Sequence, residues 1–112
     1  MSLFNQNKLR DFGFALDSAL PDIVYHYERP AGKFPVVVWQ EDFEATSFNS
    51  DNFKAEQAMH GTIDYFTKQE YDPAIDTIQE TLVSVGCSWR VNSVQYEDET
   101  GLIHYEWEFE VR

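Results

Sequence analysis

The sequence predicts an α+β domain in which a largely antiparallel sheet of about five strands carries two helices on one face. Two observations lead to this prediction. Two segments have the apolar spacing of amphipathic helices and five resemble strands, in the order α-β-β-β-α-β-β. The chain also has 112 residues, 43% of them hydrophobic, which suits one domain with its own core. We therefore expect residues 1–112 to form a single domain.

The first helix is expected over residues 5–19. Leu9, Phe12, Leu16 and Ala19 recur at intervals of three or four, with Ala15 beside them, and form an apolar stripe. Pro21 lies just beyond the last periodic position, where a helix has to end.

Two strands should follow this helix. Residues 23–28 alternate in the manner of a strand, and residues 34–40 form an apolar run that indicates burial on both faces. Pro35 suits the beginning of a strand. Between them, residues 29–33 read RPAGK, which is typical of a turn.

The middle of the chain combines a polar segment with a long strand. Residues 41–52 have no clean period and are rich in Ser, Asn, Asp and Glu, so we expect an exposed loop. This segment also contains Phe43 and Phe48, which a merely solvated loop does not need. Residues 53–68 are expected to form a strand, in which Gly61 marks a bulge or a bend.

The second helix, residues 72–86, has the clearest local signals. Asp72 can cap the helix, Pro73 fits the first helical position, and Gly86 fits just past the end. The buried stripe is expected to contain Ile75, Ile78, Leu82 and Val85.

Two strands joined by a hairpin should close the domain. Residues 87–97 lead through the turn at 98–101 into the last strand, and Gly101 suits a positive φ in that turn. The last strand alternates strictly. One side carries Ile103, Tyr105, Trp107, Phe109 and Val111, and the other carries His104, Glu106, Glu108 and Glu110.

The three glutamates of this last strand need an explanation, because like charges about 7 Å apart along a strand gain nothing for the fold. One interpretation is that Glu106, Glu108 and Glu110 lie on the solvent face of a sheet whose other face packs on helices. Another is that this face lines a space where negative charge is useful, and that Asp64 and Glu97 add to the same field.

The charge balance limits the partners that the protein can have. Twenty Asp and Glu against eight Lys and Arg give a net charge of −12, which repels nucleic acid and anionic lipid. No apolar run approaches 18 residues, so we expect no membrane span. The single cysteine excludes a disulfide within the chain and favours a reducing compartment, and we expect no secretory signal.

Few residues suggest catalysis. Cys87 follows a helix C-terminus, whose dipole raises the pKa of a thiol. His26, His60 and His104 lie in no metal-binding motif, and we expect hydrogen-bonded or solvated strand histidines. The glycines are scattered, so no phosphate-binding loop is present. We predict a protein that is not an enzyme and has no cofactor and no metal, although with twenty acids a catalytic carboxylate pair stays open.

Taken together, the second half of the chain resembles a known family. DNFKAEQAMHGTIDYFTKQEYDPAIDTIQETL, followed by WRVNSVQYEDETGLIHYEWEFEV, is similar to the small tail-terminator, or head–tail joining, proteins of long-tailed bacteriophages and prophages. These proteins are also known as minor capsid or tail-completion proteins. The first half fits as well, with a short amphipathic helix, a VVVWQ strand and a polar segment.

The resemblance implies a ring, commonly a hexamer, that caps the finished tail tube and docks on the head connector while DNA passes through its centre. It places the protein in the virion, and in the host cytoplasm during assembly. It leaves open whether the isolated chain is a ring or a monomer. A duplex carries about one negative charge per 1.7 Å, so an acidic bore would keep it moving. Glu106, Glu108 and Glu110 are our candidates for that bore.

A head-to-tail ring needs two different contact patches on each subunit. Our candidates are the 41–52 segment, with Phe43 and Phe48, and an exposed edge of the sheet. The alternative function is a small acidic binding protein that masks a basic partner, as a DNA-mimic inhibitor does.

Overall fold

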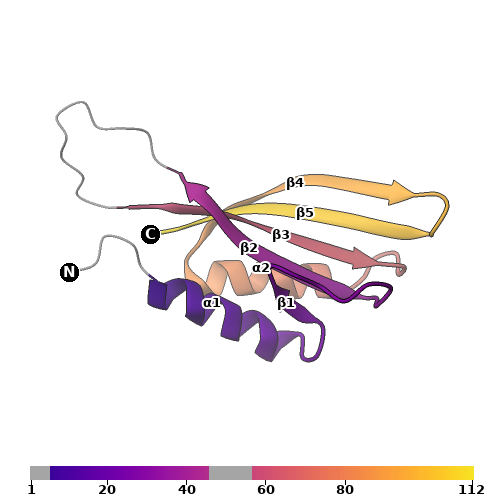
Figure 1. The fold of residues 1–112 in the computed structure, drawn as a ribbon, viewed down its shortest axis with the longest axis horizontal. Coiled ribbons are helices and arrows are strands. Elements are labelled where there is room, and N and C mark those ends of the chain that lie inside the picture. The colour runs from indigo at the N-terminus through magenta and orange to yellow at the C-terminus, as the bar shows by residue number, and fades with distance from the viewer. Residues whose placement is uncertain (1–5, 46–56) are drawn as a thin grey trace.

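The structure is a computed structural model that describes residues 6–45 and 57–112. Figure 1 shows two helices on one side of a twisted sheet. In chain order the elements are α1 (Gln6–Ala19), β1 (Val24–His26), β2 (Val36–Glu44), β3 (Met59–Thr67), α2 (Ala74–Val85), β4 (Ser88–Glu97) and β5 (Leu102–Val111). The predicted α+β class and element order are confirmed. No helix in the described ranges is long and apolar enough to cross a membrane.

The five strands lie in the order β1-β2-β3-β5-β4, so β1 and β4 are the outer strands. β1 pairs with β2 in parallel, and the other three pairs are antiparallel. A parallel pair needs a connection that returns along the sheet, and residues 27–35 provide it. The Arg29 guanidinium in this connection lies 4.2 Å from the centre of the Phe66 ring, over the sheet face turned away from the helices. We call this face the outer face, and the other the helix face.

The core lies between the helices and the helix face. The largest fully buried side chains include Trp107, Tyr65, Phe12, Phe109 and Leu16. Leu9, Phe12 and Leu16 of the predicted apolar stripe are the buried residues of α1, whereas Ala19 is exposed because it lies at the end of the helix.

Close packing explains a glycine inside α1. A Cβ on Gly13 would lie only 2.6 Å from the indole of Trp39, so any side chain at this position would push α1 away from β2. The glycine costs some helix propensity but allows this close approach.

The ends of α2 agree with the prediction. Asp72 accepts a hydrogen bond from the backbone N–H of Ala74 at 2.9 Å, and Pro73 has helical dihedral angles. Gly86 ends the helix with a φ of +85°. Gly101, in the β4–β5 turn, also has the expected positive φ, of +73°.

The prediction of a loop over residues 41–52 is wrong for its first part. β2 continues to Glu44, and its register shifts between Glu41 and Phe43, opposite Gly61 and His60. This bulge inserts one residue into the alternation, so the segment has no clean period although it is a strand. Residues 46–52, Phe48 included, lie outside the described residues, as do 53–56 of the long strand predicted before β3.

Candidate functional site

The three glutamates of β5 lie together on the outer face, as the alternation predicts. Their neighbours in the strand, Trp107 and Phe109, point into the core. On β3, Asp64 is paired with Glu106 and therefore lies on the same face, so it adds to the acidic group as expected. We call Glu106, Glu108 and Glu110 the acidic row.

The members of the acidic row are paired with other side chains. Glu108 Oε2 accepts a hydrogen bond from Arg90 Nε at 2.7 Å, and Arg90 Nη2 forms an ion pair with the same oxygen at 2.6 Å. Glu106 accepts one from the Asn92 amide, and Glu110 lies 3.8 Å from Arg112 Nη2. The hydrogen bond from Arg90 is the main reason why the pKa of Glu108 is lowered. The outer face is thus a network of paired charges and not a bare row of carboxylates.

His60 lies at the centre of this network. Its Nδ1 is 2.7 Å from Asp42 Oδ1, its Nε2 is 3.2 Å from Glu108 Oε1, and its ring stacks on Phe43. Two carboxylates facing both ring nitrogens are satisfied only when both nitrogens carry protons. Partial burial lowers the pKa of His60, but the hydrogen bonds and charges of Asp42 and Glu108 outweigh this effect and raise the pKa overall.

We expect His60→Ala to lower the free energy of unfolding by about 2 kcal/mol at pH 6, because two charge-assisted hydrogen bonds are lost. The pKa of His60 is raised in the folded state, so its contribution is complete below the unfolded pKa of about 6.5 and is lost as the pH rises through the folded pKa. The difference between the two proteins should therefore shrink by pH 8 to 9. Urea denaturation at both pH values measures it, and an equal difference at both would contradict the pairing.

The other two histidines are also paired. His104 Nε2 lies 2.7 Å from Asp64 Oδ1, and the ring stacks on Phe66. His26 Nε2 lies 2.8 Å from Glu41 Oε1 on the helix face. The prediction of hydrogen-bonded strand histidines is confirmed for all three. Within residues 6–45 and 57–112, no three His, Cys, Asp or Glu side chains are placed to hold a metal ion.

Cys87 is buried. Burial is the main cause that raises its pKa, and the nearby charge of Lys8 opposes this only in part.

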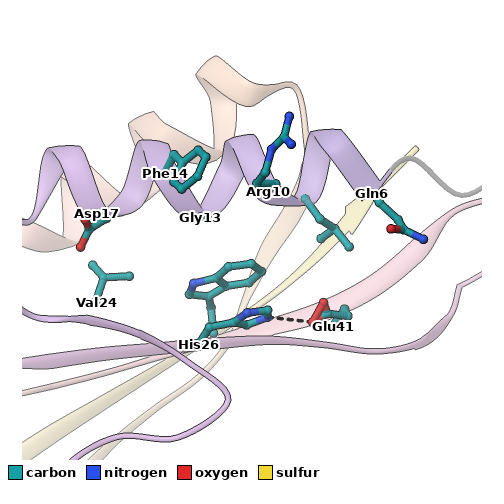
Figure 2. Close-up of a pocket in the computed structure, with 10 residues that line it drawn as sticks. Gln6, Arg10, Gly13, Phe14, Asp17, Val24, His26 and Glu41 are labelled. Carbon is teal, nitrogen blue, oxygen red and sulfur yellow. Dashed lines mark hydrogen bonds and ion pairs between the residues drawn. The ribbon is translucent and has the colours of Figure 1, made fainter.

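A groove of about 540 Å³ lies between α1 and the edge of the sheet formed by β1 and β2. Figure 2 shows Gln6, Arg10, Phe14 and Asp17 along the helix, with Val24, His26 and Glu41 on the sheet side. The apolar lining comes from Leu9, Phe14, Val24 and Trp39. We call this hollow the α1 groove.

The polar groups on the sheet side of the α1 groove satisfy one another. Glu41 accepts hydrogen bonds from His26 and from the Tyr27 hydroxyl. Partial burial would raise the pKa of Glu41, but the hydrogen bonds from Tyr27, from its own backbone and from His26 lower it overall. Since this carboxylate is already paired, covering the groove leaves no new isolated charge at this side.

At the opposite edge of the sheet, β4 exposes apolar side chains on the helix face. Val91, Val94 and Tyr96 pair with Trp107, Tyr105 and Ile103 of β5, which fixes the face on which they lie. Their exposed fractions are 44%, 55% and 63%. We call these three residues the β4 overhang, because they lie beyond the cover that the helices give to the rest of the sheet.

The structure describes one of the two phenylalanines that the sequence singled out as contacts. Phe43 is anchored on its own domain through the stacked His60 ring, yet 56% of it stays exposed. Phe48 is outside the described residues. Sequence reasoning missed the β4 overhang and the α1 groove. The alternating apolar residues of β4 were a signal, but their exposure depends on where α2 lies.

Comparison with known proteins adds no family to this description. No protein-family model matches the chain, and a search of curated proteins finds no match.

Proposed function

We propose that this protein is a structural component of a phage or prophage virion, a tail terminator that forms a ring on the tail tube at the head–tail junction. The observation that carries the proposal is the presence of two unlike apolar surfaces at opposite edges of one sheet, the α1 groove and the β4 overhang. A head-to-tail ring requires two different patches of this kind on every subunit. The sequence resemblance to tail terminators and the order of the elements support the same role.

In this role the protein works through shape and charge, without a catalytic step, a cofactor or a metal. Its partners are further copies of itself, the tail tube protein and the head connector. It acts in the virion and, during assembly, in the cytoplasm of the bacterial host. The ring is expected to be a hexamer, which the isolated chain forms only weakly if it needs the tube as a template.

Light scattering across a range of salt concentrations tests this proposal against the alternative. Copies with a net charge of −12 repel one another, so raising the salt from about 0.1 M to 1 M, which shortens the Debye length from about 10 Å to 3 Å, should promote ring formation. A DNA-mimic inhibitor would stay monomeric, and salt would weaken its complex with a basic partner. Binding to purified tail-tube ends, seen by electron microscopy, completes the test. A monomer that ignores tube ends would contradict the proposal.

We further propose that the acidic row faces the DNA in the bore. The row lies on the sheet face turned away from the helices, where one face of a closed ring can present it to the centre. Its internal partners leave it less negative than its sequence suggests, and the one arginine or lysine among the residues paired with it on β3 and β4 is Arg90, which Glu108 already holds. A face of this kind gives a passing duplex few points of attachment.

Reversing two charges of the acidic row tests whether the row faces the DNA in the bore. Glu106→Lys with Glu110→Lys keeps Glu108, which holds Arg90 and His60. In particles complemented with this variant, we expect DNA ejection to slow at least about tenfold, because every subunit adds two lysines that can bind phosphates.

The control is Asp76→Lys with Glu80→Lys, which makes the same charge change at exposed positions of α2. Particles with the control should eject DNA at the normal rate. Equal ejection rates for the two variants would remove the acidic row from the bore.

A further inference from the structure

The α1 groove and the β4 overhang lie on the same side of the sheet, at opposite edges. The groove is bounded by α1, which packs on the helix face, and by β1 at one edge. The overhang is on the helix face of β4, at the other edge. A second copy can be placed beside the first in the same orientation, with its β1 edge next to the β4 edge of the first. Its α1 then continues the helix layer over β4 of the first copy, which the helices of that copy leave uncovered.

The two surfaces are also similar in length. The groove follows α1 from Gln6 to Asp17, eleven steps of about 1.5 Å, or about 16 Å. The overhang runs from Val91 to Tyr96, but because the register shifts between Val91 and Ser93 it spans only Trp107 to Ile103 of β5, four steps of about 3.3 Å, or about 13 Å. Both run roughly along the strand direction, so one exposed strand face can occupy most of the groove.

The exposed apolar residues of the α1 groove and of the β4 overhang also suit each other. Phe14, on the helix side of the groove, is 64% exposed although it lies next to the core residues of α1. The overhang offers two β-branched side chains and one tyrosine, which suit a shallow groove lined by aromatic and aliphatic groups. The groove also contains no unpaired carboxylate on its sheet side, because Glu41 is held by His26 and Tyr27.

Opposite charges would also meet at one end of this contact between two copies. The β4–β5 turn carries Glu97, Asp98 and Glu99, all exposed. At the same end of the sheet but at the opposite edge, Lys33 Nζ lies 3.2 Å from the hydroxyl of Tyr25 in β1. The strand register shows that Lys33 and the β4–β5 turn lie at the same end of the sheet. Val36, close to Lys33 in the sequence, is aligned through β3 and β5 with β4 residues next to that turn. A side-by-side arrangement therefore brings the acidic turn of one copy to the lysine of the next.

We propose that the β4 overhang of one copy docks in the α1 groove of the next copy, and that this repeated contact closes the ring. The partner of both surfaces is thus the same chain. This inference rests on the proposed function for its biological meaning, but the contact itself can be tested without phage components.

Two cysteine variants test the contact. Phe14→Cys and Val94→Cys are each made in a Cys87→Ala background, mixed, and treated with a short bis-maleimide. Docking raises the local concentration of the two thiols from about 10 μM to about 1 mM, so the mixed dimer should form roughly a hundredfold faster than in the control. The control mixes Phe14→Cys with Val83→Cys, an exposed apolar position on α2 outside both surfaces. One chain that carries both Phe14→Cys and Val94→Cys should give a ladder of oligomers.

The outcomes separate this contact from the proposed function. Cross-linking of Val94→Cys with itself would show that two β4 strands meet and would overturn the inference. Rings seen by light scattering without the Phe14–Val94 product would overturn it while leaving the tail-terminator role intact. The product without binding to tail-tube ends would support the contact and contradict the proposed function. No product at about 1 mM protein, with or without tube ends, would overturn the inference.

Discussion

Replacing Asp72 with alanine is expected to lower the free energy of unfolding by about 3 kcal/mol, because the buried carboxylate accepts three hydrogen bonds. Tyr65 donates at 2.6 Å, Thr67 at 2.7 Å, and the N–H of Ala74 at 2.9 Å. Asp72 therefore joins the end of β3 to the beginning of α2. Urea denaturation at pH 7, followed by tryptophan fluorescence, measures the loss.

The same residue predicts a loss of stability in acid. Burial raises the pKa of Asp72, but the hydrogen bonds from Tyr65, Ala74 and Thr67 outweigh it and lower the pKa overall. Its contribution is therefore complete above the unfolded value of about 3.9 and is lost as the pH falls through the folded pKa. The matched control is Asp76→Ala, an exposed acid in the first turn of α2, which should cost no more than about 0.5 kcal/mol. Equal losses for the two variants would contradict this account of Asp72.

The second large effect is expected at Gly61. A Cβ at this position would lie 2.4 Å from Cζ of Phe109 and 2.5 Å from the carbonyl oxygen of Gln40. The ring could turn, but the backbone of β2 cannot give way without disturbing the pairing beside the bulge. We therefore expect Gly61→Ala to cost about 2–3 kcal/mol.

Gly101→Ala is the control for Gly61→Ala, because it makes the same chemical change where a Cβ meets nothing within 4 Å. Its φ of +73° makes it mildly unfavourable, at about 1 kcal/mol. Thermal or urea unfolding of both variants gives the comparison. A Gly61→Ala protein as stable as Gly101→Ala would mean that β2 and Phe109 can move apart freely.

Local sequence signals predicted the elements well where each signal is complete within a few residues. Asp72, Pro73 and Gly86 mark both ends of α2, and the alternation of β5 gave the face on which each of its residues lies. The prediction failed where one inserted residue broke the period, because the bulge at Glu41 and Phe43 made a strand resemble a loop. Nor did it give the parallel pairing of β1 with β2, since strand direction depends on the path of residues 27–35 and not on periodicity.

The candidate site was predictable only in part, for a related reason. The face on which Glu106, Glu108 and Glu110 lie follows from their spacing alone. Their partners do not, because Arg90 and His60 are 18 and 48 residues away from Glu108 in the sequence. The alternation of β4 indicated the apolar residues of the β4 overhang but not their exposure, since an apolar residue on an outer strand looks like a core residue until the helices are placed.

The exposed outer strand has one more consequence, which concerns solubility. β4 presents its ten residues at the edge of the sheet, where only the register shift between Val91 and Ser93 and the charges of Arg90 and Glu97 interrupt it, since the strand has no proline and no lysine. Mutual repulsion between copies with a net charge of −12 then has to keep free chains apart. Acidification neutralises the carboxylates and removes this repulsion, while the edge of β4 stays exposed. An unassembled chain is therefore expected to precipitate at low pH through edge-to-edge pairing of its β4 strands.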